Sequence, residues 1–154
     1  MSNYKDFNDI WKGFPLQGNK PAIITFERTS FQTTSFSELI HSVEKLASGL
    51  LSAGLQKQDR VILQGENSAA WIIAALGIIR AGGVVIPLDS QLMSDTLAYI
   101  IEDSSAKWAF LHEKKEEHLR ENFPNITIQA YHLDTDSSNP KSSHQLSGEK
   151  PKEF

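Results

Sequence analysis

The segment Gln64-Gly65-Glu66-Asn67-Ser68 is the first place at which this sequence could bind a nucleotide, because it follows an apolar run at 61–63 that predicts a buried strand. A glycine-rich turn between a strand and a helix lets backbone N–H groups approach a phosphate. This segment has one glycine where the dinucleotide fingerprint needs three, and Glu66 would repel a pyrophosphate. The chain contains no Walker A sequence and no Gly-x-Ser-x-Gly. We therefore expect no cofactor-binding residue here.

The histidines are the other residues that could bind a metal ion or take part in catalysis. There are five of them: His41, His112, His118, His132 and His144. His112 and His118 are six positions apart and fall on different faces of a helix, and no His-plus-carboxylate set has the spacing of a zinc site. The run 112–118 carries charges of both signs, which is typical of a solvated helix face. We expect surface histidines and neither catalytic nor metal-binding residues.

Composition narrows the class of protein further. The chain has 154 residues, 40% of them apolar and 22% charged, which suits one soluble globular domain with a real core. The net charge of −4 and the pI near 5.7 give no reason to expect nucleic acid or anionic lipid as a partner. There is no cysteine, and the first 14 residues lack the apolar stretch of a signal peptide, so a cytoplasmic location is expected.

The element around which the chain is organised lies at 67–89. Residues 69–79 contain no charge and predict a helix over 69–81, buried nearly all round, with Asn67 as its N-cap. Gly82 suits the position after the helix, where φ is often positive, and 84–86 predict a strand buried on both faces. A helix of this length reaches about 20 Å at 1.5 Å per residue. A bilayer core needs about 30 Å, so no transmembrane segment is expected.

The N-terminal third predicts one helix, a hairpin and a second helix. Residues 1–20 form an amphipathic segment, whose helix either packs on the body or binds a partner in isolation. Two strands at 22–26 and 31–34 follow, joined by a turn. Ser35 and Glu38 then form a capping box that begins a helix ending at Gly54. The polar side chains expected to face away from its apolar stripe are His41, Ser42, Glu44, Lys45 and Ser48.

The remaining segments alternate between strand and helix patterns. The crossover from 61–63 through the central helix to 84–86 is a βαβ unit, so parallel pairing is expected. Helices at 94–103 and 113–122 and strands at 107–111 and 126–133 complete a mostly parallel sheet with flanking helices over residues 21–133. Residues 134–154 are rich in Ser, Pro and charge and predict a flexible polar tail or linker.

The order of these segments resembles the start of an AMP-forming acyl-CoA synthetase, a member of the adenylate-forming family. Five elements of this chain resemble family patterns in the same order. Ser35-Phe36-Ser37-Glu38-Leu39 resembles the family's Thr-Tyr-x-Glu-Leu, and the segments 46–50 and 54–55 follow it as in the family. Asp59-Arg60-Val61 resembles Gly-Asp-Arg-Val, Asn67 to Trp71 resembles Asn-x-x-x-Trp, and residues 79–89 resemble Lys-Ala-Gly-(apolar)-Pro-Leu-Asp. They cover residues 21–112. Gln58 stands where the family turn has glycine, and Phe36 where it has tyrosine.

The resemblance implies the N-terminal part of the family's large domain, in which these elements serve mainly as scaffold. It implies a parent enzyme that converts a carboxylate and ATP to an acyl-adenylate and then to a CoA thioester, with ATP, Mg and CoA as cofactors and a long-chain fatty acid as the type of substrate. The family's phosphate loop, hinge and catalytic lysine match nothing in these 154 residues, so no catalytic residue is carried over and the chain alone is expected to be inactive. The alternative is a stand-alone, non-catalytic α/β interaction domain.

Two partners are expected from this interpretation. The first is the remainder of the parent large domain. The second is another copy of the chain, because the apolar central helix would keep one uncovered side, with Trp71, Ile72 or Ile78 as candidates, and an isolated chain would then form a homodimer.

Overall fold

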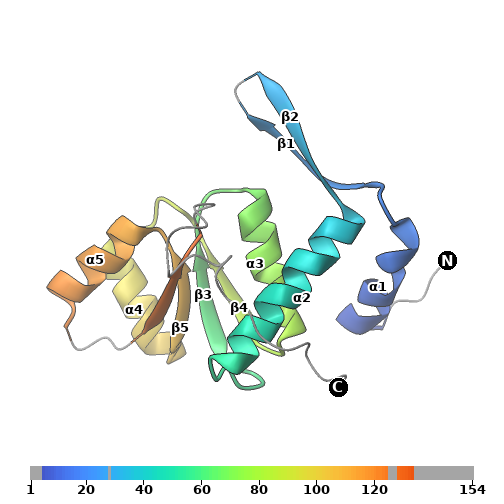
Figure 1. Ribbon diagram of the computed structural model, residues 1–154. Coiled ribbons are helices and arrows are strands. Elements are labelled where there is room, and N and C mark those ends of the chain that lie inside the picture. The colour runs from blue at the N-terminus through green and yellow to red at the C-terminus, as the bar shows by residue number, and fades with distance from the viewer. Residues whose placement is uncertain (1–4, 28, 125–127, 134–154) are drawn as a thin grey trace.

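The computed structural model describes residues 5–27, 29–124 and 128–133 (Figure 1). The expected flexible tail at 134–154 and the first four residues of the amphipathic segment lie outside these ranges. The elements in chain order are α1 (Phe7–Gly13), η1 (Pro15–Gln17), β1 (Pro21–Glu27), β2 (Ser30–Ser35), α2 (Phe36–Ser52), β3 (Arg60–Gln64), α3 (Ala69–Arg80), β4 (Val84–Leu88), α4 (Ser94–Ser104), β5 (Trp108–Leu111), α5 (Glu113–Asn122) and β6 (Gln129–His132).

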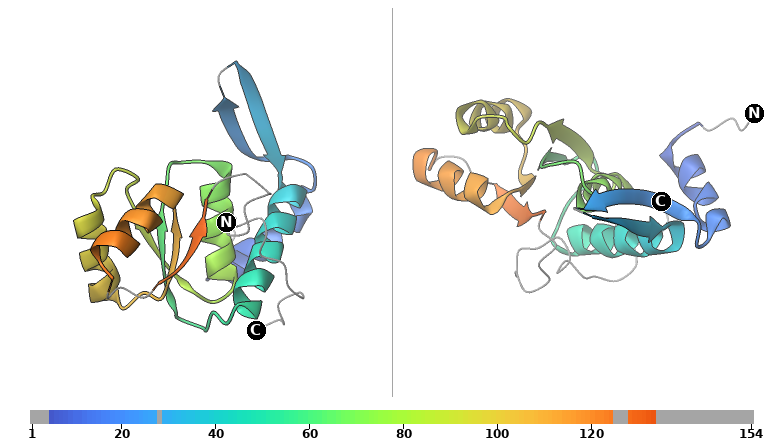
Figure 2. Two further views of the ribbon diagram at one scale, coloured as in Figure 1. Left: turned by 60° about the vertical axis from the view of Figure 1, so that its left-hand side comes forward. Right: turned by 90° about the horizontal axis from the view of Figure 1, so that it is seen from above.

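The body is built on a four-stranded sheet in the order β4-β3-β5-β6, and every pairing in it is parallel. Val61 in β3 pairs with Val85 on one side and with Trp108 on the other. Helices α2 and α3 cover one face of this sheet and α4 and α5 the other (Figures 1 and 2). The predicted α/β fold with βαβ units is confirmed.

The two faces of the sheet share the side chains of β3 by strict alternation. Val61 and Leu63 pack into the cluster beneath α2 and α3, whereas Ile62 packs into the cluster beneath α4 and α5. All three side chains are fully buried. The central strand is therefore the part of the chain that fixes the positions of both helical layers.

The predicted central helix is present as α3, but its start differs by one residue from the prediction. Ser68, not Asn67, is the N-cap, and its Oγ accepts a hydrogen bond of 3.1 Å from the Trp71 N–H. Both side chains can cap a helix, and the extended backbone of Ser68 (φ −153°, ψ 167°) decides between them. Gly82 has a φ of 84°, as predicted for the residue that follows the helix end.

The expectation that α3 is buried nearly all round is wrong. One stripe is buried, formed by Ala70, Ala74, Gly77 and Ile78. Ile79 on the other side is 39% exposed. The sheet face lies on one side of α3 and α2 packs beside it, so the remaining side of a uniformly apolar helix is half-buried, and exposed at Ile79.

The expectation that residues 84–86 form a strand buried on both faces is also wrong. Val84 is 46% exposed, and the other residues of β4 are exposed or half-buried. The reason is the strand order, because β4 pairs with β3 alone and lies at an edge of the sheet.

Helix α2 begins at the predicted capping box. Glu38 N–H donates to Ser35 Oγ, and Ser35 N–H donates to the Glu38 carboxylate at 2.8 Å. Ser48 does not follow the prediction, because it is only 3% exposed. Five consecutive residues, 46–50, are buried, so this half of the helix is enclosed on more than its apolar stripe and takes in the small serine side chain.

The N-terminal segment packs on the body, which was the first of its two expected arrangements. Trp11 in α1 is 9% exposed and lies in one cluster with Ile23, Leu39 and Val43. Strands β1 and β2 form the predicted antiparallel hairpin, which extends away from the main sheet (Figure 1). No helix in the described ranges is long and apolar enough to span a bilayer.

Candidate functional site

The place where an open parallel sheet binds ligands is the carboxyl edge at its topological switch point. Here the chain leaves β3 for β4 on one side and later adds β5 on the other side of β3. The candidate site therefore lies outside the ends of β3 and β5, beside Gly65 and His112.

The backbone at this edge is covered by the chain's own side chains. A Cβ added to Gly65 would lie 2.5 Å from Leu133 Cδ1 and 3.6 Å from Trp71 Cδ1. The space that a phosphate would need beside a glycine turn is thus occupied by apolar groups. Glu66 next to it is exposed and would repel an anion. The described residues at the switch point do not fit a nucleotide phosphate.

A polar arrangement that sequence reasoning missed lies on the α4 and α5 side of the same edge. Gln64 is 2% exposed, and its Nε2 donates to the carbonyl oxygens of Asp89 at 2.9 Å and Leu92 at 3.3 Å. Lys115 Nζ donates to the same Leu92 oxygen at 2.6 Å. These bonds hold the loop that follows β4 against the end of β3 and against α5. The one hint in the sequence was a glutamine that directly extends an apolar strand.

The buried pair of Glu116 and His132 corrects two predictions. Both residues are 4% exposed, so Glu116 does not belong to a solvated helix face and His132 is not a surface histidine. His132 Nε2 lies 2.8 Å from Glu116 Oε2, and Arg120 Nη2 donates to Glu116 Oε1 at 2.6 Å. The carboxylate thus joins α5 to β6. Glu116 and the buried Leu119 are spaced so that they lie on one face of α5. This spacing was the signal in the sequence that Glu116 is buried.

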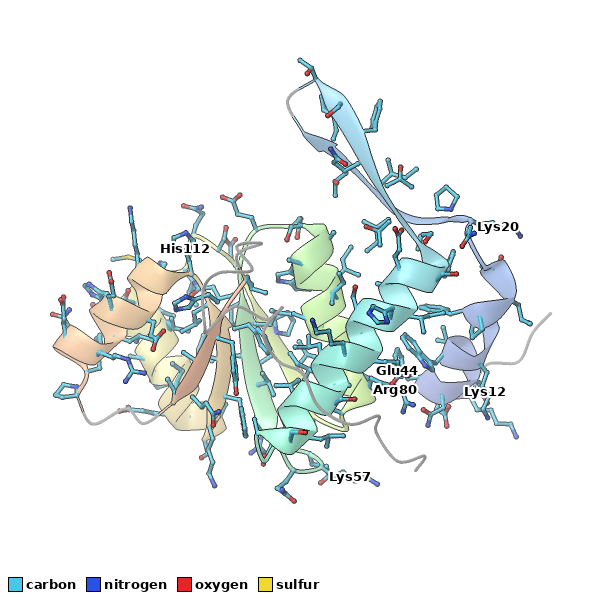
Figure 3. All side chains as sticks on the ribbon, viewed as in Figure 1. Lys12, Lys20, Glu44, Lys57, Arg80 and His112 are labelled. Atoms are coloured by element: carbon cyan, nitrogen blue, oxygen red, sulfur yellow. The ribbon has the colours of Figure 1, made fainter. Side chains whose placement is uncertain are left out.

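The other described histidines lie at the surface, as predicted. His41, His112 and His118 are exposed, and His112 caps α5 by accepting a hydrogen bond of 3.4 Å from Lys114 N–H at Nδ1 (Figure 3). His144 lies outside the described ranges. Within those ranges, no three His, Cys, Asp or Glu side chains come together in a way that could hold a metal ion.

The segment with the strongest family resemblance, residues 79–89, has a structural role at the C-terminal end of α3. Arg80 Nε donates to Glu44 Oε1 at 2.9 Å, and Trp11 Nε1 donates to the same oxygen at 3.2 Å (Figure 3). One carboxylate oxygen therefore links α1, α2 and α3. Glu44 was expected to face away into solvent, and its partly buried side chain instead joins three helices.

The turn before β3 is another element of the resemblance, and it holds β3, β4 and β5 together. Asp59 Oδ2 accepts hydrogen bonds from Gln56 N–H at 2.8 Å and from Trp108 Nε1 at 3.2 Å. Gln58 N–H donates to the Gly82 carbonyl at 2.8 Å. Gln58 has a φ of 69°, which is the conformation that glycine adopts most easily.

The pKa shifts of Glu38 and Tyr131 have structural causes. Hydrogen bonds from the Ser35 backbone and hydroxyl lower the pKa of Glu38 from its ordinary value. Burial raises the pKa of the Tyr131 hydroxyl, and a hydrogen bond of 2.7 Å from Gln129 partly opposes this shift. Neither group lies at the loop after β3.

These features define a class: a segment of a doubly wound α/β domain whose switch point is closed by its own side chains and whose polar contacts join structural elements. The family model described as AMP-binding enzyme matches residues 14–153. The chain belongs to the AMP-binding enzyme family, as the resemblance predicted, and corresponds to an N-terminal segment of it.

Curated relatives give the same family. The mitochondrial medium-chain acyl-CoA ligase ACSF2 of Mus musculus is 37% identical over 73 residues, which is 47% of this chain and 12% of that protein. Tyrocidine synthase 3 of Brevibacillus parabrevis is 26% identical over 144 residues, which is 86% of this chain and 2% of that protein. The chain thus spans a small part of the relatives that it matches.

Solved structures show the same fold. A long-chain-fatty-acid-CoA ligase of Archaeoglobus fulgidus superposes with a TM-score of 0.76 at 20% identity, covering 93% of this chain and 30% of that one. The O-succinylbenzoate coenzyme A synthetase of Bacillus subtilis in complex with AMP gives 0.71 at 18% identity, covering 93% and 34%. At these identities the likeness establishes the fold alone.

Proposed function

We propose that this chain is the scaffold segment of the large domain of an AMP-forming acyl-CoA ligase. The parent enzyme activates a carboxylate with ATP and Mg to an acyl-adenylate, releases pyrophosphate and forms a thioester with CoA. Relatives named as acyl-CoA ligases support this reaction class. A long-chain fatty acid as substrate, a role in fatty acid metabolism and a cytoplasmic location belong to the same proposal.

The observation that carries the proposal is the closed switch point. Leu133 and Trp71 occupy the space beside Gly65, and Glu66 adds a negative charge at the loop where a nucleotide phosphate would otherwise bind. ATP, Mg and CoA would therefore be held by later parts of the parent. We therefore expect the isolated chain to be inactive, because the described residues beside Gly65 offer apolar groups and a carboxylate, and not the preorganised donors that adenylyl transfer needs.

Carboxylate-dependent exchange of pyrophosphate into ATP tests the inactivity of the isolated chain. The expected result is exchange at background level with palmitate, octanoate or acetate, in a preparation made in a host strain lacking its own acyl-CoA synthetase. A full-length acyl-CoA ligase assayed in parallel shows that the conditions support exchange. Exchange above background by the purified 154-residue chain would contradict the proposal.

A stand-alone, non-catalytic interaction domain is the second candidate function. It is favoured by the core, because Phe110, Leu50 and Ile62 are fully buried by residues of this chain. The coding sequence beyond Phe154 separates the candidates. A Ser/Thr/Gly-rich loop ending in Pro-Lys would identify the parent ligase, and its absence would favour the stand-alone domain.

We also propose that the isolated chain forms a homodimer. Of the three residues expected to form its contact on the central helix, Ile78 is excluded because it is fully buried. Trp71 and Ile72 are half-buried and give that side of α3 little free apolar area.

A further inference from the structure

The largest concentration of exposed apolar side chains lies on one face of the β1-β2 hairpin. Ile24, Phe26 and Phe31 are 61%, 64% and 71% exposed. The register places Ile24 opposite Thr33 and Phe26 opposite Phe31, and the phenyl rings of the latter pair lie 4.9 Å apart. These four residues share one face, which we call the hairpin face.

The opposite face of the hairpin is already used by the chain. Ile23 is 8% exposed and packs against Trp11, Leu39 and Val43. Among the described residues the hairpin face has no such cover, since the hairpin extends beyond the α2 N-terminus and away from the main sheet (Figures 1 and 2). A two-stranded sheet is marginally stable on its own and gains from a further layer.

The other strongly exposed apolar residues do not form a comparable surface. Leu16, Met93 and Tyr99 lie on η1, in the loop before α4 and on α4, and isolated exposed apolar residues are normal. The hairpin face combines three apolar side chains with one threonine and carries no charge. Such a surface is complementary to itself, because it needs no opposite charge on its partner.

We propose that the hairpin face is the interface through which two copies of this chain dimerise, with the same face of each copy packed across a two-fold axis. A large aromatic side chain buries about 150–250 Å². At the observed exposures, the three apolar side chains offer roughly 400 Å², about half of the ~800 Å² per partner in a standard interface. The adjoining exposed Thr33 and the strand backbone supply further area. The inference deepens the proposed homodimer by naming its surface.

Sedimentation velocity of the full chain from about 1 to about 200 µM tests the surface, because an interface below the standard size is expected to form a weak dimer. The parent chain is expected to dimerise within this range. Phe26→Ser and Phe31→Ser should each raise the dimer dissociation constant by about tenfold or more, as for residues at the centre of an interface. Leu16→Ser is the matched control, since it removes an even more exposed apolar side chain from another element, and it should leave the constant unchanged.

Ile79→Ser separates the hairpin face from the exposed side of α3 and should also leave the dissociation constant unchanged. Circular dichroism of each variant checks that the fold is retained, which is expected because the altered side chains are exposed. A chain that stays monomeric at the highest concentration would overturn the inference. A dimer that survives Phe31→Ser but is weakened by Ile79→Ser would overturn the surface while leaving the proposed homodimer intact.

Cross-linking gives a positive readout, because the chain has no cysteine of its own. Thr33→Cys lies on the hairpin face and Gln32→Cys on the opposite face, and both positions are exposed. A short bismaleimide should give a covalent dimer with Thr33→Cys and little with Gln32→Cys. Equal yields would contradict the assigned face. The pyrophosphate-exchange test of the proposed function is independent of either result.

Discussion

Gln58 stands in a backbone conformation that favours glycine, and replacing it with glycine should stabilise the protein. Its φ is 69°, its side chain is exposed, and its N–H donates to the Gly82 carbonyl at 2.8 Å. A left-handed conformation costs an L-residue about 1–2 kcal/mol. Glycine removes this cost and keeps the main-chain hydrogen bond.

The gain is reduced by the greater freedom of glycine in the unfolded chain, which costs about 0.5–1 kcal/mol. The expected net stabilisation from Gln58→Gly is therefore about 0.5–1 kcal/mol. With a urea dependence near about 2 kcal/mol per molar, the unfolding midpoint should rise by roughly 0.3–0.5 M.

Urea titration followed by tryptophan fluorescence measures this shift. Trp108 is a suitable reporter because its Nε1 donates to Asp59 in the same turn. Gln58→Ala is the control, since it removes the side chain but keeps the strained conformation, and its midpoint should stay at or below that of the parent. A Gln58→Gly midpoint no higher than that of Gln58→Ala would refute the reasoning.

Three further predictions concern stability. Gly82→Val should lower the unfolding free energy by about 1–2 kcal/mol or more, because a β-branched residue is strained at a φ of 84°. A clash is not the cause, since an added Cβ meets nothing closer than Lys57 Cγ at 3.6 Å. An unchanged urea midpoint would count against this prediction. Gly77→Ala should lower the unfolding free energy by roughly 1 kcal/mol, because overpacking against Leu46 outweighs the gain in helix propensity. The added Cβ would lie 2.7 Å from Leu46 Cδ2. A double-mutant cycle with Leu46→Ala, measured by thermal melts, should show favourable coupling. Glu38→Gln should be less stable than the parent at pH 7, and the difference should disappear as the pH falls through the lowered pKa of Glu38. The reason is that a carboxylate with a depressed pKa stabilises the fold only while it is ionised. A difference in stability that persists after Glu38 is protonated would exclude this cause.

Local signals were enough to predict most elements of the fold. The capping box at Ser35 and Glu38, the glycine after α3 and the alternation of apolar runs each follow from interactions within a few residues. The parallel pairing also followed, because a strand-helix-strand crossover of this length leaves few other topologies.

Errors arose where long-range pairing decides the environment. Val84 was expected in a buried strand because its neighbours are apolar, yet strand order places β4 at an edge. Glu116 looked like a surface residue because it stands among charged neighbours, and His132 because no metal-site spacing gave it another role. Their burial depends on α5 packing against β6, which no local pattern specifies.

The candidate site could be judged from the sequence only by what it lacks. The single glycine of the loop and the charge of Glu66 argued against a phosphate site, and the packing of Leu133 against Gly65 adds a reason that no sequence pattern contained. Leu133 lies 68 positions further along the chain, so its contact with this loop depends on the complete sheet.

The contacts of segment 80–83 explain why this N-terminal segment keeps the strongest element of the family resemblance. Arg80 binds the carboxylate that joins three helices, and Gly82 supplies both the positive φ and the carbonyl that accepts from Gln58. A Cβ on Gly83 would lie 2.9 Å from Ile78 Cγ2, so the strand can start close to the helix only with glycine there. Each residue type is required by a contact inside this chain. The motif therefore identifies the scaffold of the family's large domain, and it would be required equally in a ligase and in a segment that only presents a surface to a partner.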